Sequence, residues 1–245
     1  MKTNVIYNED CLSALKKIPD GSIDTIVTSP PYNKAYWSKN RNMDNGFHTK
    51  SRRIEYENFD DCMNPDDYNK WQTDVIRECL RVLKPEGSLF YNHIDILSEH
   101  NTIHPTFVYQ FPIKQIIIWN RGNTPKLDVS YFFPITEYIF WIKKTQDAKP
   151  VFDRSKCFFK KSVWDILPEQ NNSHPAPLPM KLACNCIAGT CGEGGIVLDP
   201  FMGSGTTALA ALECKCQYIG CELSPQYVKT AEKRIKEATS QLKLF

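Results

Sequence analysis

The sequence predicts an α/β fold, organised as one domain over residues 1–245, in which helices cover both faces of an open sheet. Three observations predict it. A length of 245 residues is usual for one large domain. Apolar runs of strand length alternate with segments of helical periodicity, which is typical of α/β proteins. Near the C-terminus, a glycine-rich turn lies between a buried strand and a helix, and an acidic residue ends the next strand.

The N-terminal part predicts a short helix, a buried strand and a long loop. Asp10 precedes the helix at residues 11–17 and can cap it. The strand at residues 23–28 ends where two prolines follow, because proline cannot donate a hydrogen bond to a strand ladder. Residues 33–64 are polar and basic with little periodicity, so they predict a loop of a length that is usually functional.

A long helix and a strand are expected next. Apolar residues recur at helical spacing over residues 66–83, with Asn64 as a suitable N-cap and Pro65 at the first helical position. Residues 84–87, Lys-Pro-Glu-Gly, predict the turn that ends this helix. Residues 88–92 then predict a strand.

The middle of the chain predicts two more strands, at residues 115–120 and 138–143, separated by a turn-rich loop. Residues 145–178 show no clear element. A helix is expected at residues 180–190.

The C-terminal part has the strongest pattern. A buried strand at residues 195–199 runs into the glycine-rich turn, and a helix follows at residues 208–213. The next strand covers residues 218–222, and Ser224 with Pro225 predicts the start of the final helix. This order of elements is that of a mononucleotide-binding half of an open α/β sheet.

Composition excludes several classes of protein. No run of 18 apolar residues predicts a membrane-spanning helix, and acidic residues precede any apolar stretch at the N-terminus, so no secretory signal is expected and a cytoplasmic location is the default. The ten cysteines include two Cys-x-Cys pairs, a spacing that suits a metal site poorly. We therefore expect reduced, mostly buried thiols and no metal.

Basic residues gather in two segments although the net charge is only +2. These segments are residues 34–53 and residues 143–161. They could form one electropositive face, or they could be two solvated loops, and the sequence leaves both readings open. The basic residues of the first segment, which are candidates for binding a polyanion, are Lys34, Lys39, Arg41, Lys50, Arg52 and Arg53.

The glycine-rich turn predicts a nucleoside-binding site. Phe201, Gly203 and Gly205 lie between strand and helix, where glycines let a ligand approach the backbone. Glu222 ends the next strand and can accept hydrogen bonds from ribose hydroxyls. The turn lacks the third glycine of G-x-G-x-x-G, since Ala208 stands there, and no phosphate-binding Gly-Lys-Ser/Thr follows. The pattern therefore favours a nucleoside cofactor without a pyrophosphate.

A second candidate site follows the strand at residues 23–28. Ser29, Pro30, Pro31 and Tyr32 lie at its carboxyl end, which is the edge where α/β sheets bind ligands. The Ser29 hydroxyl and a fixed Pro30 carbonyl can both accept hydrogen bonds from one amino group. Tyr32 offers a flat face for a base taken out of a duplex.

Together the two sites resemble a known family. T-S-P-P-Y at residues 28–32 and D-P-F-M-G-S-G-T at residues 199–206 are similar to the catalytic loop and the S-adenosylmethionine loop of DNA amino-methyltransferases. Residues 8–11, 83–89 and 174–179 extend the resemblance over nearly the whole chain. The catalytic loop precedes the cofactor loop, which resembles the beta-type, circularly permuted order of motifs.

The resemblance implies a Rossmann-like methyltransferase sheet that uses S-adenosyl-L-methionine as its cofactor. It implies Ser29, Pro30, Pro31 and Tyr32 as the catalytic residues. The implied cofactor-binding residues are Asp10, Cys11, Asp199, Phe201, Gly203, Ser204, Gly205, Thr206 and Glu222. The loop near residues 33–64 would contact DNA, and a short target-recognition region would lie near residues 144–172.

The family implies direct methyl transfer to an exocyclic amino group, with Ser29 and the Pro30 carbonyl holding its two hydrogens. Serine at the first catalytic position is associated with cytosine-N4, whereas aspartate or asparagine is associated with adenine-N6, so we expect cytosine-N4 with adenine-N6 as the alternative. The expected partners are double-stranded DNA and a cognate restriction endonuclease; no membrane is expected, and a homodimer stays open.

Three other functions are weaker readings. A nucleotide-dependent oxidoreductase would have the full glycine motif and would leave Ser29 without a role. A methyltransferase of RNA or of protein glutamine would more often carry asparagine at that position. A DNA-binding module without activity would not need Glu222, and calorimetric titration with S-adenosylmethionine would separate it from an enzyme.

Overall fold

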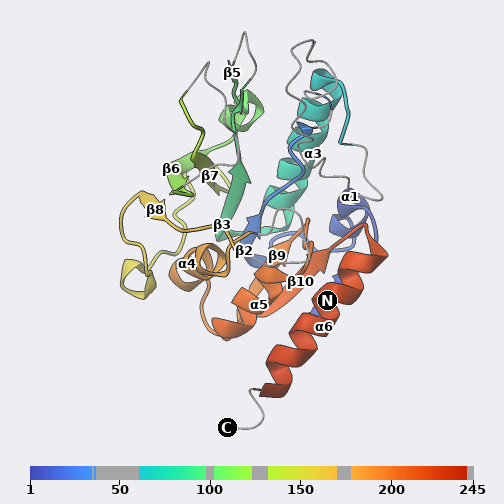
Figure 1. The fold of residues 1–245 in the computed structure, drawn as a ribbon. Helices are drawn as coiled ribbons and strands as arrows, with labels where there is room; N and C mark the ends of the chain where they lie inside the picture. Colours follow the sequence, from blue (N-terminus) through green and yellow to red (C-terminus); the bar gives the residue numbers. More distant parts are fainter. Residues whose placement is uncertain (35, 37–60, 98–101, 123–131, 170–177, 242–245) are drawn as a thin grey trace.

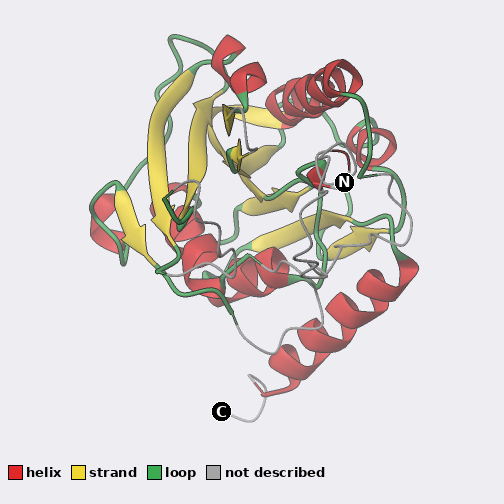
Figure 2. Ribbon diagram, turned by 45° about the horizontal axis from the view of Figure 1, so that its top comes forward, coloured by secondary structure: helices red, strands yellow, loops and turns green. Residues whose placement is uncertain are grey.

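The computed structural model describes residues 1–34, 36, 61–97, 102–122, 132–169 and 178–241, and it confirms the predicted fold class. Eight strands within these ranges form one sheet in the order β1-β10-β9-β2-β3-β7-β6-β8 (Figures 1 and 2). They are β1 (Val5–Tyr7), β2 (Ile23–Thr28), β3 (Leu83–His93), β6 (Ile113–Asn120), β7 (Thr136–Lys143), β8 (Val163–Asp165), β9 (Ile196–Asp199) and β10 (Gln217–Cys221). Two short strands, β4 (Ile96–Leu97) and β5 (Thr102–Ile103), pair separately.

The sheet is parallel from β1 to β3 and reverses direction at β7. β7 pairs antiparallel with both β3 and β6, while β8 is parallel to β6. His93 near the end of β3 lies opposite Tyr138, and Asn120 at the end of β6 lies opposite Thr136. The start of β7 therefore lies at the same edge as the carboxyl ends of β1, β10, β9, β2, β3 and β6.

Helices cover both faces of the sheet, as predicted (Figure 1). On one face lie α1 (Cys11–Leu15), α3 (Pro65–Val82) and the 3-10 helix Thr106–Gln110. On the other lie α4 (Met180–Thr190) and α5 (Thr206–Glu213), and α6 (Pro225–Gln241) packs against α5.

Two consecutive residues of β2 are apolar because the strand is covered on both faces. Ile26 packs into the core beneath α1 and α3, whereas Val27 packs into the core beneath α4 and α5. Both side chains are buried, so both positions favour apolar residues.

The boundary between α3 and β3 differs from the prediction. α3 ends at Val82, and residues 84–87, which were predicted to be a turn, belong to β3. The ladder with β2 shifts register here, because Ile23 pairs with Leu83 while Thr25 pairs with Ser88. A bulge in β3 thus accommodates the proline, which a regular central strand would not tolerate.

Six short elements escaped prediction: β1, β4, β5, β8 and the 3-10 helices Thr106–Gln110 and Arg154–Lys156. Each has two to five residues, which is too short for a periodic pattern. β8 and the helix Arg154–Lys156 lie in residues 145–178, where no element was expected.

The predicted helix caps are confirmed. The Asn64 side chain accepts hydrogen bonds from the backbone N–H groups of Asp66 (3.1 Å) and Asp67 (3.0 Å). The Ser224 hydroxyl accepts one from Tyr227 (3.4 Å). All ten cysteines are free thiols and eight are buried, as expected. Across the described ranges, no helix is both long enough and apolar enough to span a membrane.

Gly205 provides a test of how tightly α5 and α6 are packed. Its φ is +86°, and a Cβ at this position would lie 2.8 Å from the Cβ of Ala231 in α6. Gly205→Ala should therefore lower the free energy of unfolding by about 2 kcal/mol, measured by urea denaturation.

The control is Gly192→Ala, because a Cβ there meets no atom within 4 Å. We expect that substitution to change stability by less than about 0.5 kcal/mol. Equal effects at the two positions would contradict the proposed packing constraint.

Candidate active site

The structure brings the two predicted motifs together at the centre of the sheet. β2 lies between β9 and β3, so the loop after Thr28 and the loop after Asp199 leave neighbouring strands at the same edge. The Thr28 hydroxyl donates a hydrogen bond of 2.7 Å to Asp199 Oδ1. A direct side-chain contact therefore joins the base of the catalytic loop to the base of the cofactor loop.

Asp199 is a buried carboxyl group with three hydrogen-bond donors. Besides Thr28, the Thr207 hydroxyl (2.6 Å) and the Phe201 backbone N–H (3.0 Å) donate to it. Burial raises the pKa of Asp199 to about 6, and the three donors only partly oppose that rise. The carboxyl group connects β9, the cofactor loop, α5 and β2.

The cofactor loop is held from its other side by Glu222. One carboxylate oxygen accepts the backbone N–H of Gly203 and the other accepts that of Ser224, each at 2.8 Å. Burial raises the pKa of Glu222. Because a carboxylate oxygen has two lone pairs, each oxygen keeps one acceptor position beyond these bonds.

Arg234 in α6 is a support of this loop that sequence reasoning missed. Its Nη1 donates to the Ser204 carbonyl (2.6 Å) and to the Ser204 hydroxyl (2.9 Å). Ser204 was predicted to bind the cofactor, but its buried side chain hydrogen-bonds Arg234 here. No sequence signal distinguishes Arg234 from the other basic residues of the final helix.

The N-terminal cofactor motif divides into an exposed and a buried residue. Asp10 is exposed and caps α1, since its Oδ1 accepts the Ser13 N–H at 3.1 Å. The Cys11 side chain lies in the core between α1 and α3, and burial raises the pKa of its thiol. Phe201 is half-buried, and its ring meets that of Trp71 edge-on at 5.6 Å. Trp71 was expected only as a core residue of the helix.

The catalytic loop is tethered to α3 through its prolines. Tyr68 Oη and Gln72 Nε2 donate to the Pro31 carbonyl, at 2.8 and 3.1 Å. The ring of His93 contacts Tyr68 Oη at 2.9 Å, and burial lowers the pKa of His93 to about 4, so the ring is neutral at pH 7. These bonds fix the loop one residue beyond the Pro30 carbonyl.

Tyr32 is more enclosed than expected for a stacking platform. Only 8% of it is exposed. Its ring centroid lies 4.9 Å from that of His93, and Lys34 Nζ lies over the ring at 4.9 Å. Its hydroxyl lies 2.7 Å from Ser29 Oγ. A base that stacks on Tyr32 would have to displace Lys34, or bind with the ammonium group as a neighbour.

Three polar residues that sequence reasoning missed lie behind Tyr32. They are Asn92 at the end of β3, Glu137 at the start of β7 and Arg121 after β6. Asn92 Nδ2 donates to Tyr32 Oη and to Glu137 Oε2 (2.7 Å), and Arg121 Nη1 donates to Glu137 Oε1 (2.9 Å). The sequence held one signal for them: Glu137 and Asn92 are polar residues within otherwise apolar strand segments.

Of the six candidate DNA-binding residues, five lie outside the residues that the structure describes. Lys34 is described and lies against Tyr32. Lys39, Arg41, Lys50, Arg52 and Arg53 lie outside the described residues, as do residues 174–177. The described part of the expected target-recognition region, up to residue 169, exposes Phe158 and Leu167 among several lysines.

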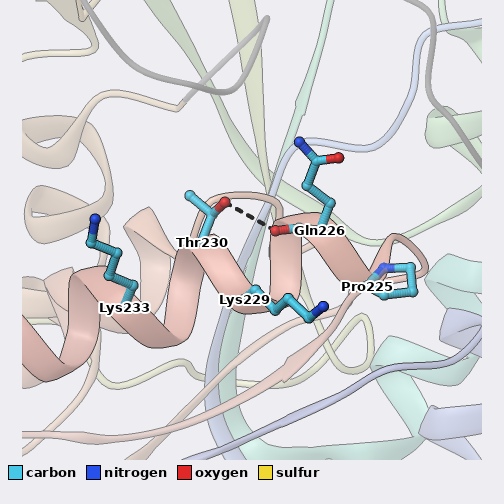
Figure 3. A pocket seen from close by; sticks show the side chains of 5 residues that line it. All are labelled: Pro225, Gln226, Lys229, Thr230 and Lys233. Atoms are coloured by element: carbon cyan, nitrogen blue, oxygen red, sulfur yellow. Dashed lines mark hydrogen bonds between the residues drawn. The ribbon is translucent and has the colours of Figure 1, made fainter.

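A shallow depression on α6 does not belong to this site. Pro225, Gln226, Lys229, Thr230 and Lys233 line it, and Figure 3 shows all five on one helix. The Thr230 hydroxyl donates to the Gln226 carbonyl of its own helix, at 2.9 Å (Figure 3). Within the ranges that could be placed, no group of three or more His, Cys, Asp or Glu side chains is arranged to hold a metal ion.

Comparison with known proteins identifies the family. Residues 23–233 match the DNA methylase family of N6 and N4 enzymes. The chain belongs to this family. The methylase is 30% identical to the type II methyltransferase M.BglII of Bacillus subtilis, over 93% of this chain and 68% of the relative. It is 26% identical to the DNA adenine methyltransferase YhdJ of Escherichia coli K12, over 97% of this chain and 84% of the relative.

Solved structures share the fold. The PvuII DNA methyltransferase, named as cytosine-N4-specific, superposes with a TM-score of 0.72 at 21% identity, over 98% of this chain and 91% of the other. A DNA modification methylase of Thermus thermophilus, complexed with S-adenosyl-L-methionine, gives 0.67 at 23% identity, over 95% and 93%. The predicted beta-type amino-methyltransferase is thereby confirmed as to family and sheet.

The raised pKa of Asp199 predicts a pH-dependent contribution to stability. The folded chain binds this proton more tightly than the unfolded chain, whose carboxyl has a pKa near 3.8. Between pH 4 and pH 6 the folded state binds more of this proton than the unfolded state does, so stability falls as the pH rises and the contribution is lost as the pH passes the folded pKa. The pKa difference corresponds to about 3 kcal/mol.

Asp199→Asn removes this titration. We expect the free energy of unfolding of the natural protein to fall relative to that of the variant as the pH rises from 4 to 6, in urea titrations at each pH. A difference between the two proteins that is constant over this range would show that Asp199 titrates normally.

Proposed function

We propose that this methylase transfers a methyl group from S-adenosyl-L-methionine to the exocyclic N4 amino group of a cytosine in double-stranded DNA. The position of Ser29 carries the proposal, since it leaves the sheet beside a loop anchored through Asp199. Membership of the DNA methylase family supports the transfer of a methyl group to DNA.

The residues around the cofactor loop fit a nucleoside cofactor. Each oxygen of Glu222 has an acceptor position left for a ribose hydroxyl. Gly203 and Gly205 both have positive φ, so the loop has a backbone shape that other residues rarely adopt. Trp71 and Phe201 add an aromatic surface at the same edge. When bound, S-adenosylmethionine would supply an electrophilic methyl group here.

The protein's part in the reaction is to hold the amino group. An exocyclic amine is a poor nucleophile because its lone pair is delocalised into the ring. Ser29 Oγ and the Pro30 carbonyl would accept its two hydrogens and favour a pyramidal nitrogen whose lone pair points out of the ring. The bonds from Tyr68 and Gln72 to the Pro31 carbonyl keep the loop in place before DNA binds, so the rate gain comes from preorganisation.

The choice of cytosine rests on Ser29 and on the fold shared with a cytosine-N4 enzyme. Adenine-N6 is the second candidate, because the relatives include a named DNA adenine methyltransferase. Both bases present an amino group beside a ring nitrogen, so Ser29 and the Pro30 carbonyl could hold either one.

Contacts with DNA and with other proteins complete the proposal. The basic loop near residues 33–64, beginning with Lys34, would bind phosphates, and residues near 144–172 would recognise the target sequence. The type II methyltransferases among the relatives support a cognate endonuclease that acts on the same site. A homodimer is compatible with this arrangement.

The test of the proposed base uses DNA that carries many sequences. The protein should transfer label from S-adenosylmethionine to DNA, and mass spectrometry of the digested nucleosides should find N4-methylcytosine. Ser29→Ala should slow single-turnover transfer by roughly 100-fold, because one acceptor of the amino group is lost. Ser240→Ala, an exposed serine on α6, is the matched control. Detection of N6-methyladenine alone would assign the enzyme to the second candidate.

Glu222 predicts how tightly the cofactor binds. Glu222→Gln replaces one carboxylate oxygen with an NH2 group, which donates and cannot accept a hydrogen bond, so calorimetry should show S-adenosylmethionine binding weakened by roughly 10- to 100-fold. Glu232→Gln, exposed on α6, should bind as the natural protein does. An unchanged dissociation constant for Glu222→Gln would remove this residue from the cofactor site.

A further inference from the structure

Five polar side chains form a continuous chain of contacts from the surface to the catalytic serine. It runs from Arg121 through Glu137, Asn92 and Tyr32 to Ser29. Asn92 lies in β3, Glu137 lies in β7, and Arg121 directly follows β6. These three strands are adjacent, and the loop after β2, which carries Ser29 and Tyr32, is next to β3 (Figure 1). Glu137 is 6% exposed and Asn92 is 2% exposed, so the middle of the chain is screened from water.

Arg121 and Glu137 fix the direction of hydrogen bonding at the outer end. A guanidinium group only donates and an ionised carboxylate only accepts. Arg121 donates to Glu137 Oε1 at 2.9 Å, which leaves Glu137 Oε2 to accept from the interior. The carboxylate thus presents an acceptor to Asn92 and Tyr32.

The orientation of the Asn92 amide follows from that carboxylate. Only the NH2 group can face Glu137 Oε2 at 2.7 Å, because the amide oxygen there would place two acceptors against each other. The same Nδ2 donates to Tyr32 Oη. Asn92 Oδ1 is left buried and accepts no hydrogen bond in the described part of the chain. A buried acceptor without a partner is costly, and such groups often occur at functional sites.

The direction then passes through Tyr32 to Ser29. Tyr32 Oη has one hydrogen, and it accepts from Asn92 on one side. Glu137 Oε2 lies 3.4 Å away and Ser29 Oγ lies 2.7 Å away. The bond from Tyr32 to Glu137 is long. However, if the Tyr32 hydroxyl hydrogen pointed toward Ser29, a lone pair of the phenol oxygen would face the negatively charged Glu137 carboxylate. The negative charge therefore favours donation from Tyr32 to Glu137, so Ser29 must be the donor to Tyr32.

We propose that Glu137 is a positioning residue that sets the Ser29 hydroxyl as an acceptor for the target amino group. With its hydrogen committed to Tyr32 Oη, Ser29 Oγ presents only lone pairs to the base. The opposite direction would place a hydroxyl hydrogen against the amine hydrogens. The inference rests on the proposed function only in requiring an amino-group substrate, and it holds equally for cytosine and adenine.

The test uses substitutions of similar shape to reverse the direction of hydrogen bonding between Tyr32 and Ser29. Asn92→Leu removes the amide but keeps the Glu137 carboxylate as the acceptor for Tyr32. Adding Glu137→Gln turns that acceptor into a donor, because Arg121 holds the amide oxygen, and Tyr32 must then donate to Ser29. Single-turnover transfer by Asn92→Leu should be roughly threefold slower than the natural rate, because Tyr32 loses one donor. The pair Asn92→Leu/Glu137→Gln should be slower than Asn92→Leu alone by a further factor of roughly 10 to 100.

Tyr32→Phe supplies the decisive comparison. Alone, it should slow transfer by roughly tenfold, because the Ser29 hydroxyl is then free to turn toward the amine. When Tyr32→Phe is added to the Asn92→Leu/Glu137→Gln double variant, transfer should become faster and reach the rate of Tyr32→Phe alone, because no phenol hydroxyl remains to donate to Ser29. A purely structural role would instead give losses that add. Glu78→Gln, from the Arg81–Glu78 pair on α3, is the control for breaking an Arg–Glu contact.

Two further measurements keep each result interpretable. Dissociation constants for S-adenosylmethionine should be the same in all variants, since a folding defect would change them. Neutron diffraction from deuterated crystals of the natural protein should find the phenol deuteron between Tyr32 and Glu137. A deuteron bonded to Tyr32 Oη and directed toward Ser29 would overturn the proposal. So would slower transfer when Tyr32→Phe is added to the Asn92→Leu/Glu137→Gln double variant. Label found in adenine would overturn the proposed base alone.

Discussion

Asp199 accepts hydrogen bonds from Thr28, Thr207 and the Phe201 backbone, and the rest of the proposed active site depends on this buried carboxyl group. Thr28 immediately precedes the catalytic loop, and Phe201 begins the cofactor loop. Thr28 and Asp199 are 171 residues apart in the sequence, so two distant loops share one anchor. Because methyl transfer requires the donor and the acceptor to be held in line, an anchor common to both sites limits how far they can shift apart.

Most of the fold could be predicted from the sequence, and so could the part of the candidate site that follows the parallel strands β2, β9 and β10. Strand–loop–helix patterns located β2, β9 and β10, and the Pro-Pro and glycine motifs marked the loops that follow them. Such signals are local: a proline, a glycine with positive φ or a cap acts within a few residues. The long strand β3 was predicted too short because Pro85 and Gly87 normally indicate a turn, while here a bulge keeps them in the ladder.

Residues that act across strands could not be found in the same way. Asn92 belongs to β3, Glu137 belongs to β7 and Arg121 follows β6. Arg234 reaches Ser204 from a helix 30 residues away in the sequence. Each is an ordinary polar residue in its own segment, and only the register of β3, β7 and β6 brings three of them together. The local sequence also did not indicate how little of Tyr32 is exposed, because its ring is covered by His93 and Lys34.

The antiparallel turn of the sheet at β7 has a consequence for how this enzyme can diverge. In a wholly parallel sheet, the carboxyl edge receives only the last residues of strands and the loops that follow them, whereas here β7 also begins at that edge. Here Asn92 lies within β3 and pairs with Ile139 of β7, while Glu137 lies within β7 and pairs with Trp119 of β6. The polar contacts behind Ser29 therefore lie outside the segments that we propose to read DNA, near residues 33–64 and 144–172. Under that proposal, those segments could accumulate substitutions and acquire new target sequences without changing the contacts behind Ser29.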